Sequence, residues 1–405
     1  MSSIDKAPIL ITAGGTGGHV YPGLAVARAL QEQDIPVIWM GTRKGLEARV
    51  IPEAGIEMAW LEVSGIRGKG AGALLMAPFR LVKALLQSIR IMRQYKPAAV
   101  LGMGGFVAGP GGLVASLMGI PVIIHEQNAV AGTTNKLLSR FVLEKLEGFP
   151  GTFPEKQDAI AVGNPVRPEI AALPAPQERL ASHEGAFRLL VIGGSLGAKA
   201  LNEIVPLALC ALPKDMQVEV VHQAGEATID LCQRTYKAAG VQAHIVPFIE
   251  DMAGAYEWAD LIICRAGALT IAEVSAAGLA SILVPYPYAI DDHQTENAKY
   301  LAEQGAAILA NQDELTQDSL SQVLEALIKN REQLVAMSEK ARALAMTDAT
   351  EKVAIICADI AGYPYQVSDK GLHTPDFAEA ADAQNDASVT ENKVAEPVSE
   401  QRGDA

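Results

Sequence analysis

The chain has 405 residues, a length that suggests two domains rather than one. Its formal net charge of −14 disfavours a general nucleic-acid-binding protein, and its 49% of hydrophobic residues with only 5% aromatic ones suit an α/β protein. No stretch has the ~20 apolar residues of a membrane span and no signal peptide is recognised, so a cytoplasmic protein is expected. The scattered cysteines have no metal-like spacing and are expected to be buried thiols of a reducing compartment: Cys210, Cys232, Cys264 and Cys357.

Eight apolar runs have the composition of strands that are buried on both faces of a parallel sheet. They cover residues 7–13, 37–40, 99–101, 122–124, 187–192, 218–221, 261–264 and 281–284. Helix-like stretches separate most of them, so the sequence predicts two Rossmann-like, doubly wound parallel-sheet domains. Ligands of such sheets bind at the carboxyl ends of the strands, and we expect a site in a cleft between the domains.

The domain boundaries are expected in stretches that lack this pattern. A Pro/Ala-rich stretch over residues 168–186 divides a first domain at 7–165 from a second at 187–344, and a helix at 345–362 is expected to return to the first domain. Residues 366–405 are acidic and lack periodic apolar residues, so a disordered tail is expected there.

The first predicted strand leads into a glycine-rich loop, Gly14–Gly18, followed by His19. Such a loop lets backbone N–H groups and a helix N-terminus approach an anion, although glycines can also serve tight strand–helix packing. It is no dinucleotide fingerprint, because Val20 takes the place of the last glycine and no acid ends the second strand; a P-loop lysine is also missing. A histidine at a helix start is disfavoured as a cation, so His19 is a candidate general base.

Further polar or glycine-rich segments follow the next strands of the first half. Residues 102–112 are dense in glycine, and His125–Asn128 is a polar group expected in the loop after the strand that ends at Ile124. Arg167 closes the first half and could face a phosphate or a base across the cleft.

The second half repeats the strand–loop–helix pattern, with a glycine loop at residues 193–198. After the strand at 261–264, a helix is expected to begin near Ala268 with N–H groups available for a diphosphate. Glu273 could accept both hydroxyls of a ribose, or it could form a capping box with Thr270. Gln294 could bind sugar hydroxyls, whereas the adjacent Asp291 and Asp292 are a weak metal signal.

Residues 63–125 contain no acid but seven basic side chains. In this stretch, apolar residues at 74–79, 81, 82, 85, 86, 89 and 92 alternate with Arg80, Lys83, Arg90 and Arg93. This pattern suits an interfacial surface on anionic lipid, but most of these apolar residues also fit an amphipathic helix that packs inward.

Together the motifs resemble the MurG family, the N-acetylglucosaminyltransferases of peptidoglycan synthesis with the GT-B fold. The resemblance runs from about residue 8 to 361 and rests on segments in the family's order: 14–19, 64–70, 104–112, 125–132, 163–167, 193–198, 265–273 and 291–294. Residues 141–149 are more charged than is usual for the family's strand at this place.

The resemblance implies transfer of GlcNAc from UDP-GlcNAc to the C4 hydroxyl of MurNAc in undecaprenyl-linked lipid I, with inversion, to form lipid II. It implies a peripheral protein on the anionic cytoplasmic face of the bacterial inner membrane, no nucleic acid, no essential protein-bound metal, and partners among cell-wall synthesis and division proteins. A UDP-GlcNAc epimerase-like enzyme and a non-catalytic UDP-sugar-binding scaffold are the alternatives.

The resemblance also assigns roles to residues of this chain. His19 is the first candidate for the general base and His125 the second. The substrate-binding residues it implies are Thr16, Gly17 and Gly18 at the donor sugar and acceptor diphosphate, Asn128 and Gln294 at GlcNAc, Arg167 and Ser195 at the nucleotide, Ile249 at uracil, and Ala268, Leu269, Thr270, Ile271, Ala272 and Glu273 at diphosphate and ribose.

Overall fold

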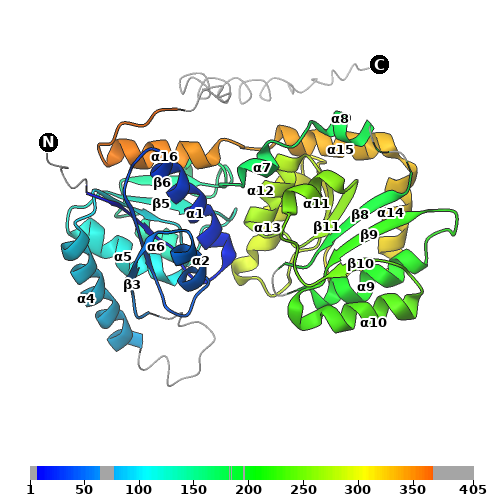
Figure 1. The fold of residues 1–405 in the computed structure, drawn as a ribbon, viewed down its shortest axis with the longest axis horizontal. Coiled ribbons are helices and arrows are strands. Elements are labelled where there is room, and N and C mark those ends of the chain that lie inside the picture. Colours follow the sequence, from blue (N-terminus) through cyan, green and yellow to red (C-terminus); the bar gives the residue numbers. More distant parts are fainter. Residues whose placement is uncertain (1–6, 64–76, 182, 184, 195–196, 368–405) are drawn as a thin grey trace, which may run out of the picture. The chain divides into compact units, whose positions relative to one another are not determined.

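The structure is a computed structural model that describes residues 7–63, 77–181, 183, 185–194 and 197–367. The described residues form two parallel sheets with helices on both faces (Figure 1). The chain from Gln366 onward is a separate unit. Of the predicted acidic tail, only Gln366 and Val367 belong to the described residues.

The strands of the first sheet are all parallel to their neighbours. In spatial order they are β3 (Glu57–Trp60), β2 (Val37–Gly41), β1 (Ile9–Thr12), β4 (Ala99–Gly102), β5 (Val122–Glu126), β6 (Glu144–Glu147) and β7 (Ile160–Ala161). In the register, Ile11 lies between Trp39 and Leu101. The central strand β1 is buried along its whole length, as expected of a continuous apolar run in a parallel sheet.

Side chains of β1 alternate between two apolar clusters. Ile9 and Ile11 face one cluster with helices α1 (Gly17–Glu32), α2 (Glu47–Glu53) and α16 (Ala349–Ile360). Leu10 faces the other cluster, with α4 (Ala77–Tyr95), α5 (Gly105–Leu117) and α6 (Thr133–Leu138). The first sheet is therefore covered on both sides.

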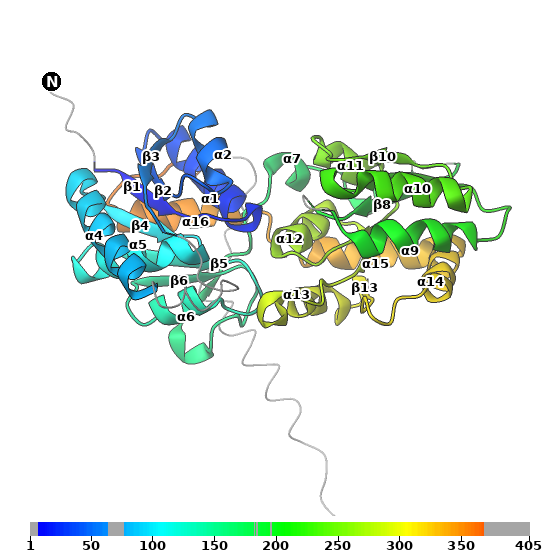
Figure 2. The same cartoon turned by 90° about the horizontal axis from the view of Figure 1, so that it is seen from below.

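Helix α16 follows all elements of the second sheet in sequence but packs on the first. It lies beside α1 (Figure 2), and its Val353 and Cys357 are fully buried in the same cluster as Ile9.

The second sheet repeats the plan of the first. Its parallel strands, in spatial order, are β10 (His244–Val246), β9 (Val218–Gln223), β8 (Phe187–Ile192), β11 (Leu261–Cys264), β12 (Ala280–Leu283) and β13 (Ala307–Leu309). One face packs on α9 (Lys199–Cys210), α10 (Ile229–Ala239) and α14 (Gln317–Lys329). The other packs on α7 (Pro168–Ala171), α11 (Met252–Trp258), α12 (Ala268–Ala277) and α13 (His293–Ala302). Helix α15 (Arg331–Ala343) contributes to both clusters, and α8 (Pro176–Ala181) packs on α15.

The predicted fold class is confirmed, and each of the eight predicted strands occurs. The strands that the apolar pattern missed are β3, β6, β7, β10 and β13, which lie at or next to the edges of their sheets. One expectation about the cysteines is wrong: Cys210 is exposed, whereas the other three are buried. No helix in the described part of the chain is long and apolar enough to cross a membrane.

Candidate active site

The first glycine loop joins β1 to α1. Gly15 has a φ of +99°, and Thr16 precedes the helix without a side-chain capping bond. A Cβ on Gly14 would lie 2.6 Å from Glu47 Oε1, so close packing requires this glycine. A Cβ on Gly18 would meet only Thr16 Oγ1, at 3.9 Å, so packing does not explain that glycine. The packing alternative thus accounts for one end of the loop only.

Glu47 on α2 supports this loop, although no sequence motif marks it. Its buried carboxylate accepts hydrogen bonds from Gly15 N (3.1 Å), Thr42 N (2.9 Å) and Thr42 Oγ1 (2.7 Å). No acid that could bind a ribose ends the second strand, and Glu47, a few residues later, holds the glycine loop instead.

His19 lies in the first turn of α1 and contacts a residue of the β5 loop. Its Nδ1 is 2.7 Å from Oε1 of the buried Gln127. Gly104 and Gly105, with φ of +91° and +76°, leave room beside it, because a Cβ on Gly104 would lie 3.1 Å from His19 Nδ1. A Cβ on Gly105 would lie 2.7 Å from the carbonyl oxygen of Gly14, so the two glycine loops meet backbone to backbone.

His125 was expected in a loop after Ile124, but β5 continues to Glu126 and both residues are buried within the strand. The Nε2 of His125 donates to Gly163 O at 2.9 Å, and Nδ1 lies 2.9 Å from Gln127 Nε2. Burial lowers the pKa of His125 to about 4. Both ring nitrogens of this second candidate base are therefore engaged inside the protein.

The carboxylate of Glu126 organises the loop that carries Asn128. It accepts from Asn128 N and Nδ2, both at 3.1 Å, and from Gly132 N and Asn135 Nδ2, both at 2.9 Å. Asn297 of α13 reaches this loop, since its Oδ1 accepts from Ala129 N (2.8 Å) and its Nδ2 donates to Asn128 Oδ1 (3.3 Å). These bonds connect the β5 loop of the first sheet with a helix of the second.

Helix α12 begins at Ala268 as predicted, and its N-cap is Gly267, without a side-chain capping bond. Its first turns contain the predicted residues Ala268, Leu269, Thr270, Ile271 and Ala272. Thr270 lies inside the helix rather than at the N-cap, so the capping-box alternative for Glu273 is wrong.

The buried Glu273 carboxylate is hydrogen-bonded on both oxygens. Oε1 accepts from Arg167 Nη2 (2.9 Å) and Nε (3.1 Å), and Oε2 accepts from Tyr256 OH (3.1 Å). Burial raises the pKa of Glu273, and the Arg167 guanidinium opposes that rise. A contact of Arg167 with the nucleotide stays a prediction, whereas its ion pair with Glu273, the candidate ribose ligand, was not predicted.

Two further predicted residues belong to the domain of the second sheet: Ile249 follows β10, and Gln294 lies on α13. Ile249 donates its backbone N–H to Gln223 Oε1 at 3.2 Å, and Gln294 Oε1 accepts from Tyr286 N at 2.9 Å. Ser195 lies outside the described residues. No group of three or more His, Cys, Asp and Glu side chains in the described ranges is arranged to hold a metal.

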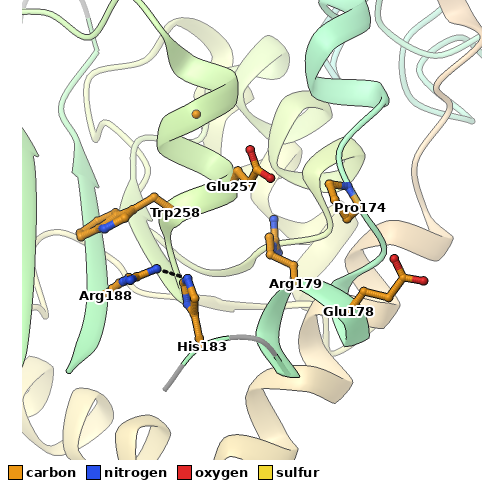
Figure 3. A pocket seen from close by; sticks show the side chains of 8 residues that line it. Pro174, Glu178, Arg179, His183, Arg188, Glu257 and Trp258 are labelled. Carbon is orange, nitrogen blue, oxygen red and sulfur yellow. Dashed lines mark hydrogen bonds between the residues drawn. The ribbon is translucent and has the colours of Figure 1, made fainter. Parts of the chain in front are cut away.

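A hollow of about 470 Å³ lies elsewhere on the second sheet, against α8 and α11 (Figure 3). None of the predicted site residues lines it. Its Arg179 is buried and donates to the carbonyl oxygens of Tyr256, Ala277 and Gly278, while His183 bonds Asp260 at 2.9 Å. These contacts fasten the segment before β8 to the second sheet, which is a structural role.

Comparison with known proteins agrees with this architecture. The family models of the glycosyltransferase family 28 N-terminal and C-terminal domains match residues 9–145 and 188–353. A UDP-N-acetylglucosamine--N-acetylmuramyl-(pentapeptide) pyrophosphoryl-undecaprenol N-acetylglucosamine transferase of Dechloromonas aromatica (strain RCB) is 54% identical over 355 residues, which cover 87% of this chain and 99% of the relative. The protein of the same name from Marinobacter nauticus is 48% identical over 361 residues, 89% of this chain and 99% of the relative. The crystal structure of Acinetobacter baumannii MurG has a TM-score of 0.76 at 44% identity and covers 87% of this chain and 99% of its own. The chain belongs to glycosyltransferase family 28 and, within it, to the MurG family.

Proposed function

We propose that this chain transfers GlcNAc from UDP-GlcNAc to the MurNAc-pentapeptide of an undecaprenyl-pyrophosphate-linked acceptor, the step from lipid I to lipid II. The observation that carries the proposal is the 54% identity to a relative named for this transfer, over 99% of that relative's length. The attacking group is the C4 hydroxyl of MurNAc, and the anomeric centre of GlcNAc is inverted.

In this reaction His19 removes the proton of the acceptor hydroxyl as the hydroxyl attacks the anomeric carbon. Its place in the first turn of α1, next to the glycine loop, supports this role. The acceptor diphosphate and the donor sugar lie against Thr16, Gly17 and Gly18. Packing does not explain the glycine at position 18, which supports a close approach of substrate there. His125 serves the site indirectly, since both of its ring nitrogens are bonded inside the protein.

The leaving UDP is held by the second sheet. The N-terminal N–H groups of α12, from Ala268 onward, stabilise the diphosphate without a protein-bound metal. Glu273 accepts hydrogen bonds from the ribose hydroxyls, and Ile249 pairs with uracil through its backbone. The nucleotide is also contacted by Ser195 and Arg167. GlcNAc is bound by Asn128 and Gln294. Asn128 is bonded to Asn297 on the helix that carries Gln294, which supports a sugar site formed by both segments.

The lipid acceptor requires access to a membrane, and we propose that α4 supplies it at the anionic cytoplasmic face of the inner membrane. Four large apolar side chains of this helix are exposed: Phe79, Leu81, Val82 and Leu86. Basic residues at 80, 83, 90 and 93 accompany them and are exposed as well. Leu85, Ile89 and Met92 instead pack inward, as the amphipathic-helix alternative requires.

Residues 64–76 of the basic stretch lie outside the described residues. Cell-wall synthesis and division proteins are the partners we propose at this membrane.

The function is tested by incubating the purified full chain with radiolabelled UDP-GlcNAc and a lipid I analogue. Label should pass to the acceptor, and should still pass in EDTA if no metal is needed. His19→Ala should lower kcat by about 10²- to 10⁴-fold, the range of a lost general base, with little change in the KM for UDP-GlcNAc.

The matched control is His244→Ala, which removes an exposed histidine from β10 and should leave kcat unchanged. Formation of an epimer of UDP-GlcNAc without label transfer would establish the epimerase-like alternative. Binding of UDP-GlcNAc with no turnover under any acceptor condition would identify a scaffold.

A further inference from the structure

Gln127 occupies the centre of a buried hydrogen-bonded chain that ends at His19. The chain runs from Gly163 O to His125 Nε2 (2.9 Å), from His125 Nδ1 to Gln127 Nε2 (2.9 Å), and from Gln127 Oε1 to His19 Nδ1 (2.7 Å). His125 and Gln127 are 0% and 1% exposed, so water does not compete for these partners.

The direction of each hydrogen bond follows from the fixed end of this chain. A backbone carbonyl only accepts, so the proton of His125 must be on Nε2. Burial lowers the pKa of His125 to about 4, which leaves its ring neutral near pH 7 and makes Nδ1 an acceptor.

The amide of Gln127 must then turn its NH₂ group toward His125. That nitrogen donates both to His125 Nδ1 (2.9 Å) and to His125 O (3.1 Å). A flipped amide would place its oxygen against two acceptors and leave a buried conflict. Oε1 is therefore the atom that faces His19.

An amide oxygen only accepts, so Nδ1 of His19 must carry a proton. We infer that Gln127 is a positioning residue that holds His19 as the Nδ1–H tautomer, with Nε2 as the proton acceptor. No hydrogen bond from the described residues reaches Nε2, so its lone pair is available to a substrate hydroxyl. The tautomer follows from these hydrogen bonds together with the neutral ring of the buried His125; only the use of Nε2 as a base rests on the proposed function.

The tautomer is measured by long-range ¹H–¹⁵N NMR on the full chain labelled with ¹⁵N-histidine, with His19→Ala used to assign the signal. Wild type should have a protonated Nδ1 and an unprotonated Nε2 at His19 near pH 8. The opposite tautomer in wild type would overturn the inference. The buried His222, which bonds Asn202 and Tyr236, is the internal reference.

Gln127→Met keeps the approximate length of the side chain but removes both amide functions. It should abolish the preference for the Nδ1–H tautomer and lower kcat by at least about tenfold, because a wrong tautomer of a catalytic histidine can cost up to ~10⁴. The KM for UDP-GlcNAc and the His222 signals should change little. An unchanged His19 tautomer in the folded variant would contradict the inference.

Gln127→Glu is the conservative variant, because one carboxyl oxygen can still accept from His19 Nδ1–H while the other, when protonated, donates to His125 Nδ1. It should retain the tautomer and recover part of the kcat that Gln127→Met loses; loss of the tautomer here counts against the inference. If His19→Ala retains full activity while wild type has the Nδ1–H tautomer, the base assignment fails and the positioning geometry stands.

Discussion

Three donors converge on the carboxylate of Glu47, which is not one of the predicted substrate-binding residues. Gly15 N and the two donors of Thr42 point at its oxygens from separate segments, so this side chain sets the path of the first glycine loop. Glu47→Gln keeps the size but turns an N–H donor toward one of these donors. Because an unsatisfied buried donor costs ~1–3 kcal/mol, we expect a similar fall in the free energy of unfolding, measured by urea denaturation. A lower kcat/KM should accompany it.

The control is Glu53→Gln, an exposed acid at the other end of the same helix, which should change neither quantity. Equal stabilities of the two variants would remove Glu47 as the support of the loop.

The residues of the candidate site were predictable to different degrees. Gly14–His19 and Ala268–Glu273 follow central strands directly, so strand position and glycine content sufficed to find them. The contacts between Gln127 and His19 and between Arg167 and Glu273 join residues more than a hundred positions apart. Local spacing in the sequence does not specify which distant residue a side chain will bond, so both pairs could be identified only from the structure.

At the scale of elements, the apolar pattern recovers eight of the described strands and misses five that lie at or next to the edges of their sheets. β6 has the sequence Glu-Lys-Leu-Glu, and only Leu146 belongs to an apolar cluster. Its Glu147 is buried but accepts from Gly151 N (2.7 Å) and Phe153 N (3.0 Å), so the loop after the strand satisfies the carboxylate. A pattern based on hydrophobicity cannot anticipate a buried carboxylate that is stabilised by backbone donors in this way.

Some apolar side chains of helix α4 are buried in the protein and others are exposed on its surface. Ile91 and Met92 are buried, whereas Phe79 is 71% and Leu86 63% exposed. If the exposed side chains enter lipid, Phe79→Ser with Leu86→Ser should lower the partition coefficient onto phosphatidylglycerol vesicles by about tenfold or more, since burying such a side chain is worth ~1.5–3 kcal/mol. Vesicle sedimentation measures the change.

Activity on a soluble acceptor analogue should be unaffected by this double variant. Leu207→Ser on α9 removes another exposed apolar side chain and is the control. Equal sedimentation of wild type and the α4 variant would assign these side chains to another surface role.

At the scale of the whole molecule, the first domain includes a helix, α16, that follows the whole second domain in sequence. Val353 and Cys357 of α16 are fully buried against residues such as Ile9 and Ile35, more than three hundred positions earlier. The C-terminal segment up to Tyr363, which packs partly on the same cluster, therefore belongs to the stability of the first domain. The acidic stretch from residue 366 lies outside both matched family domains.

This arrangement predicts that only one of two changes close together in sequence lowers the stability. Val353→Ala should lower the free energy of unfolding by ~1–3 kcal/mol, because it removes buried methyl groups and leaves a cavity beside α1. Deletion of residues 366–405 should leave the thermal midpoint and kcat unchanged, because this acidic stretch lacks periodic apolar residues and lies outside both matched family domains. Calorimetry of both variants with a label-transfer assay tests this. A large loss of stability on deleting 366–405 would place a structural contact in the acidic stretch, and an unaltered Val353→Ala variant would mean that α16 adds little to the first domain.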